Sequence, residues 1–300
     1  MERITRHCDD DLPFENAGIL KTTGFELQAK WSDKLANGFR YSVGVALSDD
    51  KAKVVSYPSN PTNKIGDGVL YKGYTVGDIW GYVTGGILQE GDFDGVGANG
   101  KPLYHGPYFK GGQAYPGYIW YQDLDHDGVI TTGLNTVDDP GDRKVIGNNA
   151  PLYRYNITAN FQYKGFDLDL MFQGVGKRDY WLSSTSSYWG NGAGSWEVYN
   201  NSWTPERTDA KFPMYGSGTG SYPQTGYLLD ASYIKLKQVI LGYTFPRALI
   251  NKIGLEKLRL NLAAYNLFTI SDMPKYYDAD YLSDAYPPKR TFSVGIQVGF

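Results

Sequence analysis

The sequence predicts an all-β protein, an antiparallel transmembrane β-barrel meander with long extracellular loops. Three observations carry this prediction. Seven segments alternate between apolar and polar residues with period two, the spacing at which strand side chains point to opposite faces. The connections between these segments are short at one end of the meander and long at the other. Glycine (37 residues) and tyrosine (26 residues) are abundant, which favours strands and turns over helices.

The first four alternating segments each place aromatic and aliphatic residues on one face and polar or small residues on the other. The third is the clearest, because Tyr153, Ile157 and Phe161 share one face while Asn156 and Asn160 lie on the opposite face. The pattern therefore predicts strands over residues 24–31, 41–47, 153–163 and 166–172.

Three further strands follow, over residues 233–245, 258–264 and 292–300. The first of these changes phase near Lys237 and Gln238, which predicts a β-bulge. The last is regular, and every even position from 292 to 300 is apolar: Phe292, Val294, Ile296, Val298 and Phe300.

The connections fall into two groups. Alternate connections of an antiparallel meander lie at the same end of the sheet, and outer-membrane barrels have short turns at one end and long loops at the other. The short connections here are 32–38, 164–165 and 246–254, and the long ones are 54–151, 177–230 and 269–288.

Strand length also fits a membrane. Twelve residues at roughly 3.3 Å each span about 40 Å, and a tilt near 45° leaves about 28 Å, enough for an apolar band of about 25 Å. Aromatic residues near the strand ends suit the interfacial girdles of a membrane barrel. The alternative is that they belong to the core of a soluble β-protein. Those residues are Tyr163, Phe166, Tyr243, Phe245, Phe268 and Phe300.

Composition excludes several classes of protein. The net charge of −3 gives no basic patch for nucleic acid. A single cysteine, Cys8, rules out an internal disulfide and a cysteine-based zinc cluster. The sequence contains no run of about 18 apolar residues, so it predicts no transmembrane helix. Residues 1–13 lack the apolar core of a signal peptide, so we expect either a protein that is not exported or a missing amino terminus.

Short segments spread over nearly the whole chain carry a family resemblance. They are residues 16–18, 23–26, 81–87, 116–117, 123–130, 146–148, 163–168, 172–174, 233–239, 241–246, 266–268, 286–287 and 290–300. Through the order and spacing of these segments, the chain resembles the carboxy-terminal part of SusC/RagA-type TonB-dependent transporters of Bacteroidota.

The resemblance implies an outer-membrane barrel of about 22 strands, of which this chain holds the last seven or so. It also implies import of glycans or peptides, driven by the TonB complex and assisted by a SusD-like surface lipoprotein. The terminal Phe300 then resembles the aromatic end of a barrel-insertion signal.

Two departures from the family pattern stand out. No signal peptide or plug domain is recognisable, so we expect residues 1–300 to be a single barrel segment and a fragment that does not work alone. An open strand edge is not tolerated against lipid, which supports that expectation. The family's Asp-Pro-Glu is replaced by Asp278-Ala279-Asp280, which leaves the role of that motif open.

An acidic turn predicts a calcium site. Asp123, Asp125, Asp127 and the backbone carbonyl of Val129 match the start of a calcium-binding loop, in which alternate oxygen ligands wrap a hard cation. The twelfth position is Leu134 instead of glutamate, so a late ligand would come from Asp138, Asp139 or Asp142. The alternative is a solvated turn held by Asx hydrogen bonds.

A tryptophan-rich loop predicts a ligand or partner surface. Trp181, Trp189, Trp196 and Trp203 lie in one long connection, where flat aromatic faces would stack on sugar rings or pack against a lipoprotein. The alternative is that so long a loop needs a small core of its own.

No catalytic constellation is apparent, since His7, His105 and His126 have no spaced partners, and we expect the chain not to be an enzyme. The leading hypothesis is a segment of a nutrient-transporter barrel. The alternatives are a soluble, secreted, calcium-stabilised β-protein that binds carbohydrate, and a structural or adhesin-like barrel piece. In the leading hypothesis the lumen is lined by Gln28, Arg154, Asn156, Asn160, Gln162, Arg259 and Asn261.

Overall fold

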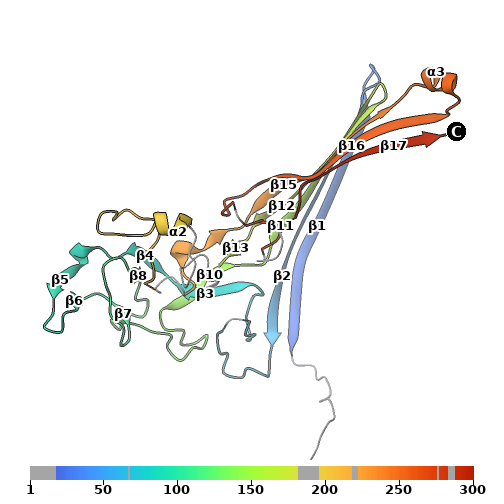
Figure 1. The fold of residues 1–300 in the computed structure, drawn as a ribbon. Helices are drawn as coiled ribbons and strands as arrows, with labels where there is room; N and C mark the ends of the chain where they lie inside the picture. Colours follow the sequence, from blue (N-terminus) through green and yellow to red (C-terminus); the bar gives the residue numbers. More distant parts are fainter. Residues whose placement is uncertain (1–17, 67, 182–195, 218–221, 276, 283–287) are drawn as a thin grey trace, which may run out of the picture.

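The computed structural model describes residues 18–66, 68–181, 196–217, 222–275, 277–282 and 288–300. Its main feature is one long antiparallel sheet of seven strands in the order β1-β2-β11-β12-β15-β16-β17 (Figure 1). The strands are β1 (Ile19–Lys34), β2 (Arg40–Ser56), β11 (Leu152–Tyr163), β12 (Phe166–Lys177), β15 (Tyr233–Thr244), β16 (Lys257–Ile270) and β17 (Thr291–Gly299).

Each long strand pairs with the one before it, so the sheet is a meander, and all seven predicted strands are confirmed. The predicted bulge is also confirmed. Gln238 of β15 pairs with Met171 of β12, Leu236 pairs with Phe172, and Lys237 between them has no partner in either neighbouring register. The bulge keeps Lys235 and Gln238 on the polar face, in the rows of Gln173 and Met171.

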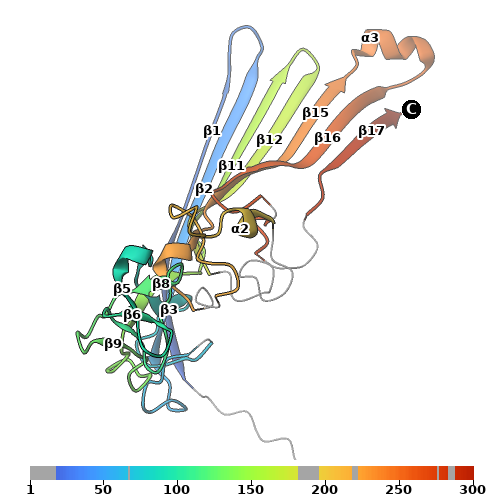
Figure 2. The same cartoon turned by 60° about the vertical axis from the view of Figure 1, so that its left-hand side comes forward.

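The long and short connections lie at opposite ends of the sheet, as predicted (Figures 1 and 2). Two short connections are tight turns. Lys34 pairs with Arg40 beside the turn between β1 and β2, and Tyr163 pairs with Phe166 beside the turn between β11 and β12. The third short connection holds α3 (Arg247–Ile250) and η3 (Asn251–Ile253). The long connections gather into a loop layer at the other end of the sheet.

The loop layer contains short elements that the sequence pattern did not predict. Strands of two to six residues are too short to show a period-two alternation. The strands are β3 (Asp78–Tyr82), β4 (Thr84–Ile87), β5 (Phe93–Val96), β6 (Pro102–Tyr104), β7 (Tyr108–Phe109), β8 (Ile119–Tyr121), β9 (Val129–Ile130), β10 (Arg143–Asn148), β13 (Asp179–Tyr180) and β14 (Leu229–Asp230). The helices are η1 (Glu90–Asp92), α2 (Trp196–Asn200) and η2 (Thr225–Tyr227).

Burial is arranged differently in the sheet and in the loop layer. Every residue of β1 is exposed, and each of the seven long strands exposes at least one large apolar side chain. The loop layer, in contrast, has its own core, in which Tyr82, Ile119, Tyr121 and Ile130 pack together. Within the described ranges, no helix has the length and apolarity needed to cross a membrane. The exposed apolar residues of the sheet include Phe25, Leu27, Trp31, Val43, Val45, Leu241, Leu260, Leu262, Phe292, Val294, Ile296 and Val298.

Candidate functional site

The candidate site is the polar face of the sheet, which the strand registers define. Gln28, Ala46, Asn156 and Gln173 form one row across four strands. Because side chains in one row of a sheet point to the same face, the register brings all the predicted lumen residues to one side. A second row runs through Gln162, Asp167, Gly242 and Asn261, and a third contains Ser42, Asn160 and Asp169.

An ion pair crosses this face between two strands that are not neighbours. The Arg259 guanidinium on β16 binds the Asp167 carboxylate on β12, through a short contact from Nη2 and a 3.3 Å hydrogen bond from Nε. Gly242 of β15 lies between them, and a Cβ there would lie 2.5 Å from both Arg259 Nη2 and Asp167 Oδ2. The missing side chain of Gly242 therefore leaves the space in which the pair forms.

Replacing Gly242 with alanine is expected to lower the free energy of unfolding by about 1–3 kcal/mol, the usual effect of overpacking. The added methyl group would push apart Arg259 and Asp167. Chemical denaturation in detergent measures the change. Gly91→Ala is the matched control, because a Cβ at Gly91 meets nothing within 4 Å. Equal stability of the two variants would contradict the spacing argument.

An open groove with a volume of about 730 Å³ lies on the polar face, in the half of the sheet nearer the loop layer. We call it the inner groove. Its wall carries both charges and neutral polar groups, so it suits a polar ligand better than an apolar one. The residues of the polar face and of the adjoining loops that line it are Glu26, Gln28, Ala46, Ser48, Pro151, Arg154, Asn156, Gln173, Val175, Arg178, Tyr233 and Asp280.

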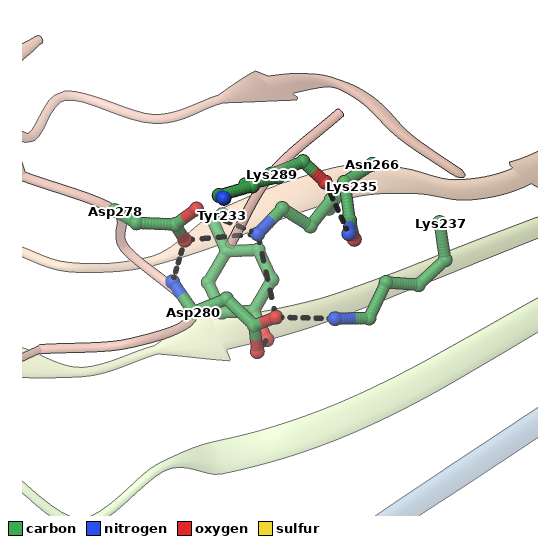
Figure 3. A network of polar contacts seen from close by, with 7 residues as sticks. All are labelled: Tyr233, Lys235, Lys237, Asn266, Asp278, Asp280 and Lys289. Atoms are coloured by element: carbon green, nitrogen blue, oxygen red, sulfur yellow. Dashed lines mark hydrogen bonds and ion pairs between the residues drawn. The ribbon is translucent and has the colours of Figure 1, made fainter. Parts of the chain in front are cut away.

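A buried ionic clamp holds the connection between β16 and β17 against this face (Figure 3). Lys235 Nζ donates to Asp278 Oδ2 at 2.8 Å and Oδ1 at 2.9 Å, and it lies 3.4 Å from Asp280 Oδ2. Lys237 Nζ donates to Asp280 Oδ2 at 2.6 Å, and the Tyr233 hydroxyl donates to Asp280 Oδ1, also at 2.6 Å. Two lysines of one strand thus reach the same carboxylate oxygen.

The clamp is well shielded, since the side chain of Lys235 is 2% exposed. Burial by itself would raise the pKa of Asp280, but hydrogen bonds from Lys237 and Tyr233 outweigh burial and hold that pKa below its ordinary value. Sequence reasoning noted the Asp278-Ala279-Asp280 segment without finding its partners. No local signal could identify them, because the lysines lie more than 40 residues earlier in the chain.

The structure brings two of the predicted calcium ligands together with a third carboxylate. Asp123, Asp125 and the fully buried Asp142 each place an oxygen within 4.8 Å of the others. Asp142 was one of three candidates for the late ligand. Asp127 lies outside this group and instead accepts a hydrogen bond from the backbone of Val129, in β9, at 2.8 Å.

The pKa values of two carboxylates in this turn shift in opposite directions. Desolvation would raise the pKa of Asp123, but backbone N–H groups of Gly128 and His126 outweigh it and lower that pKa. Desolvation and the nearby carboxylates of Asp142 and Asp127 raise the pKa of Asp125. A hard cation would relieve that repulsion. Asx hydrogen bonds also account for the shape of the turn, so calcium binding stays a prediction.

The tryptophan-rich connection divides into buried and exposed members. Trp203 is 3% exposed, and its Nε1 donates to Gln89 Oε1 at 2.9 Å. Trp181 packs against the core around Val198 and Phe212. Trp196 is 77% exposed, and Trp189 lies outside the described residues. The predicted partner surface therefore rests on Trp196 among the described tryptophans.

The chain is similar in sequence to TonB-dependent receptors. No family model matches. The chain is 28% identical over 313 residues to TonB-dependent receptor P3 of Formosa agariphila, covering 95% of this chain and 29% of that receptor. It is 26% identical to TonB-dependent receptor P26 of the same organism, covering 95% of this chain and 30% of the relative. The chain thus spans less than a third of the length of these relatives.

Solved structures agree in fold. The RagAB peptide transporter superposes with a TM-score of 0.67 at 19% identity, covering 95% of this chain and 30% of that one. The "open-open" state of the RagAB peptide importer gives a TM-score of 0.66 at 19% identity, covering 94% and 29%. The predicted outer-membrane location is confirmed by these relatives, which are receptors and transporters and not enzymes. The chain is thus a homologue of TonB-dependent receptors, with the fold of one part of a RagA-type transporter barrel.

Proposed function

We propose that this chain forms the carboxy-terminal wall of a TonB-dependent outer-membrane importer. The observation that carries the proposal is the two-sided sheet. Its apolar face exposes large apolar side chains on all seven strands, whereas its polar face carries the inner groove and the ionic clamp. Lipid would cover the first face, and the second would line the path of the ligand.

The proposed ligands are glycans or peptides, and the proposed partners are a SusD-like surface lipoprotein and the TonB complex. Two observations support them: the relatives are TonB-dependent receptors, and a structural neighbour is the RagAB peptide transporter. The exposed Trp196 in the loop layer is a suitable contact for the lipoprotein or a sugar.

Gene deletion in the native organism tests the function. We expect loss of uptake of labelled peptides or of labelled oligosaccharides, restored by the intact gene. We also expect a surface lipoprotein to copurify with the receptor from detergent-solubilised membranes. Unchanged uptake of both ligand classes would contradict the proposal.

The alternative is a soluble, secreted, calcium-stabilised protein that binds carbohydrate. It has to explain large side chains such as Phe292 and Val294, which are more than 70% exposed on a continuous face. Cell fractionation separates the two. The importer is expected in the outer membrane and requires detergent, whereas the alternative would be found in the culture medium.

Calcium binding is a separate prediction. Millimolar calcium is expected to raise the melting temperature of the detergent-solubilised protein, because three clustered carboxylates gain a cation. Asp125→Asn is expected to remove the shift. Asp94→Asn is the control, since Asp94 lies on β5 and pairs with His105. A melting temperature that is independent of calcium in the unmodified protein would leave the Asx-turn explanation.

A further inference from the structure

Arg178 of the inner groove has most of its hydrogen-bonding capacity unused. It follows the last residue of β12, and its Nε donates to the Asn149 carbonyl at 3.0 Å. A guanidinium carries five N–H donors in a planar fork. Within the described part of the chain, neither Nη group of Arg178 has a protein acceptor or a carboxylate partner.

Two other charged residues of the inner groove, Arg154 and Asp280, are already engaged. Arg154, on the same wall, pairs with Asp50. Asp280 accepts hydrogen bonds from Lys237 and Tyr233 through its two oxygens. Within the described residues, Asp280 therefore forms its ion pairs with the lysines of the clamp and forms none with Arg178.

The surroundings of Arg178 favour an incoming anion. Burial lowers the pKa of Arg178, because desolvation penalises its charged form, while Tyr233, Tyr180 and Asp280 oppose that shift. Arginine stays protonated in proteins, so the site keeps a partly desolvated cation with free donors. A carboxylate matches the two parallel N–H groups of such a fork, which gives geometry as well as charge.

We infer that Arg178 anchors a carboxylate group of the ligand in the inner groove and so selects acidic ligands over neutral ones. The inference rests on the proposed function, since it treats the groove as part of the ligand path. Neutral polar groups of Asn156 and Gln173 line the same groove and would contact the rest of the ligand. Two sources of the carboxylate fit this chemistry: the carboxy terminus of a peptide and a uronic acid of a glycan.

Binding to the full-length, detergent-solubilised protein tests the inference. The probes are a peptide pool without Asp and Glu, in free-acid and carboxy-amidated forms, together with oligogalacturonate and neutral malto-oligosaccharides. We expect one carboxylate-bearing probe to bind, and Arg178→Met to weaken it roughly 10- to 100-fold, the effect of losing charged hydrogen bonds. Arg178→Lys should bind with intermediate affinity, because it keeps the charge and loses the fork.

Lys177→Met is the matched control, because it removes the same charge from the adjacent, exposed residue, which does not line the groove. It should bind like the unmodified protein. If the peptide is the ligand, amidation should reproduce the loss and Arg178→Met should add nothing to it. If oligogalacturonate is the ligand, the malto-oligosaccharide should bind weakly to both proteins.

Three outcomes would overturn the inference: full affinity of Arg178→Met for the carboxylate probe, stronger binding of neutral probes, or no binding of either acid by the unmodified protein. Import measured in cells separates this from the proposed function. Import of neutral ligands that Arg178→Met leaves unchanged would refute only the inference. Arg178-dependent binding without any import would refute only the function.

Discussion

Replacing Lys235 with methionine is expected to lower the free energy of unfolding by about 3–5 kcal/mol, the cost of removing one partner from a buried ion pair. Lys235 is 2% exposed and holds both oxygens of Asp278, so its loss leaves a carboxylate without its cation. Lys237 would still hold Asp280. Urea unfolding followed by tryptophan fluorescence measures the change, and limited proteolysis of residues 271–290 reports release of the connection.

The double variant Lys235→Met/Asp278→Asn is expected to recover part of the loss, because it removes the uncompensated charge. Lys257→Met, an exposed lysine of β16, serves as the control and should cost little. Loss of the same size in Lys235→Met and Lys257→Met would contradict the clamp.

The clamp also predicts a dependence on pH. Folding lowers the pKa of Asp280, so its share of stability is present above the ordinary aspartate range and is lost as the pH falls below it. The stability difference between the unmodified protein and Asp280→Asn should therefore be constant near neutral pH and shrink in acid. A difference that grows on acidification would show the opposite sign and contradict the assignment.

Arginine at Leu27 is expected to impair barrel assembly, with a cost of about 2–4 kcal/mol if the residue lies at the bilayer midplane. Leu27 lies near the middle of β1 on the exposed apolar face, in register with Leu47 of β2. The charge would face lipid, where it cannot be solvated. The amount of heat-modifiable receptor in purified outer membranes, together with its urea midpoint, measures the effect.

Gln28→Arg provides the matched control, because Gln28 is the next residue along the strand and points to the polar face with Ala46 and Asn156. The same charge there should be tolerated. Equal assembly of Leu27→Arg and Gln28→Arg would show that the apolar face does not meet lipid.

Much of the sheet could be predicted because a long strand repeats a simple rule. Each of the seven segments shows enough alternating positions to identify the strand, and the phase change at Lys237 marks the bulge that the structure contains. The loop layer could not be predicted in this way. Strand β7 has two residues and pairs in parallel with β9, about 20 residues further on, a contact that no local pattern encodes.

The candidate site likewise has features that local sequence predicts and features that only packing determines. The polar residues of the groove follow from the strand pattern, since register alone places Gln28 beside Asn156 through Ala46. The acidic turn is local and was visible as a motif, although Asp142, and not Asp127, joins Asp123 and Asp125 in the cluster of carboxylates. Trp203 looked the same as Trp196 in sequence, and packing against the loop layer separates the buried residue from the exposed one.

Period-two alternation acts between residues two apart, so the sequence alone specifies which side chains share the apolar face of the sheet and which share the polar face. Ionic contacts depend on distances between segments that are remote in sequence. Lys235 meets Asp278 because the connection after β16 folds back over β15, and among the described residues Asp280 pairs with Lys237 and not with Arg178. Those pairings require the assembled sheet and loop layer, since a charge takes whichever partner the fold brings within a few ångströms.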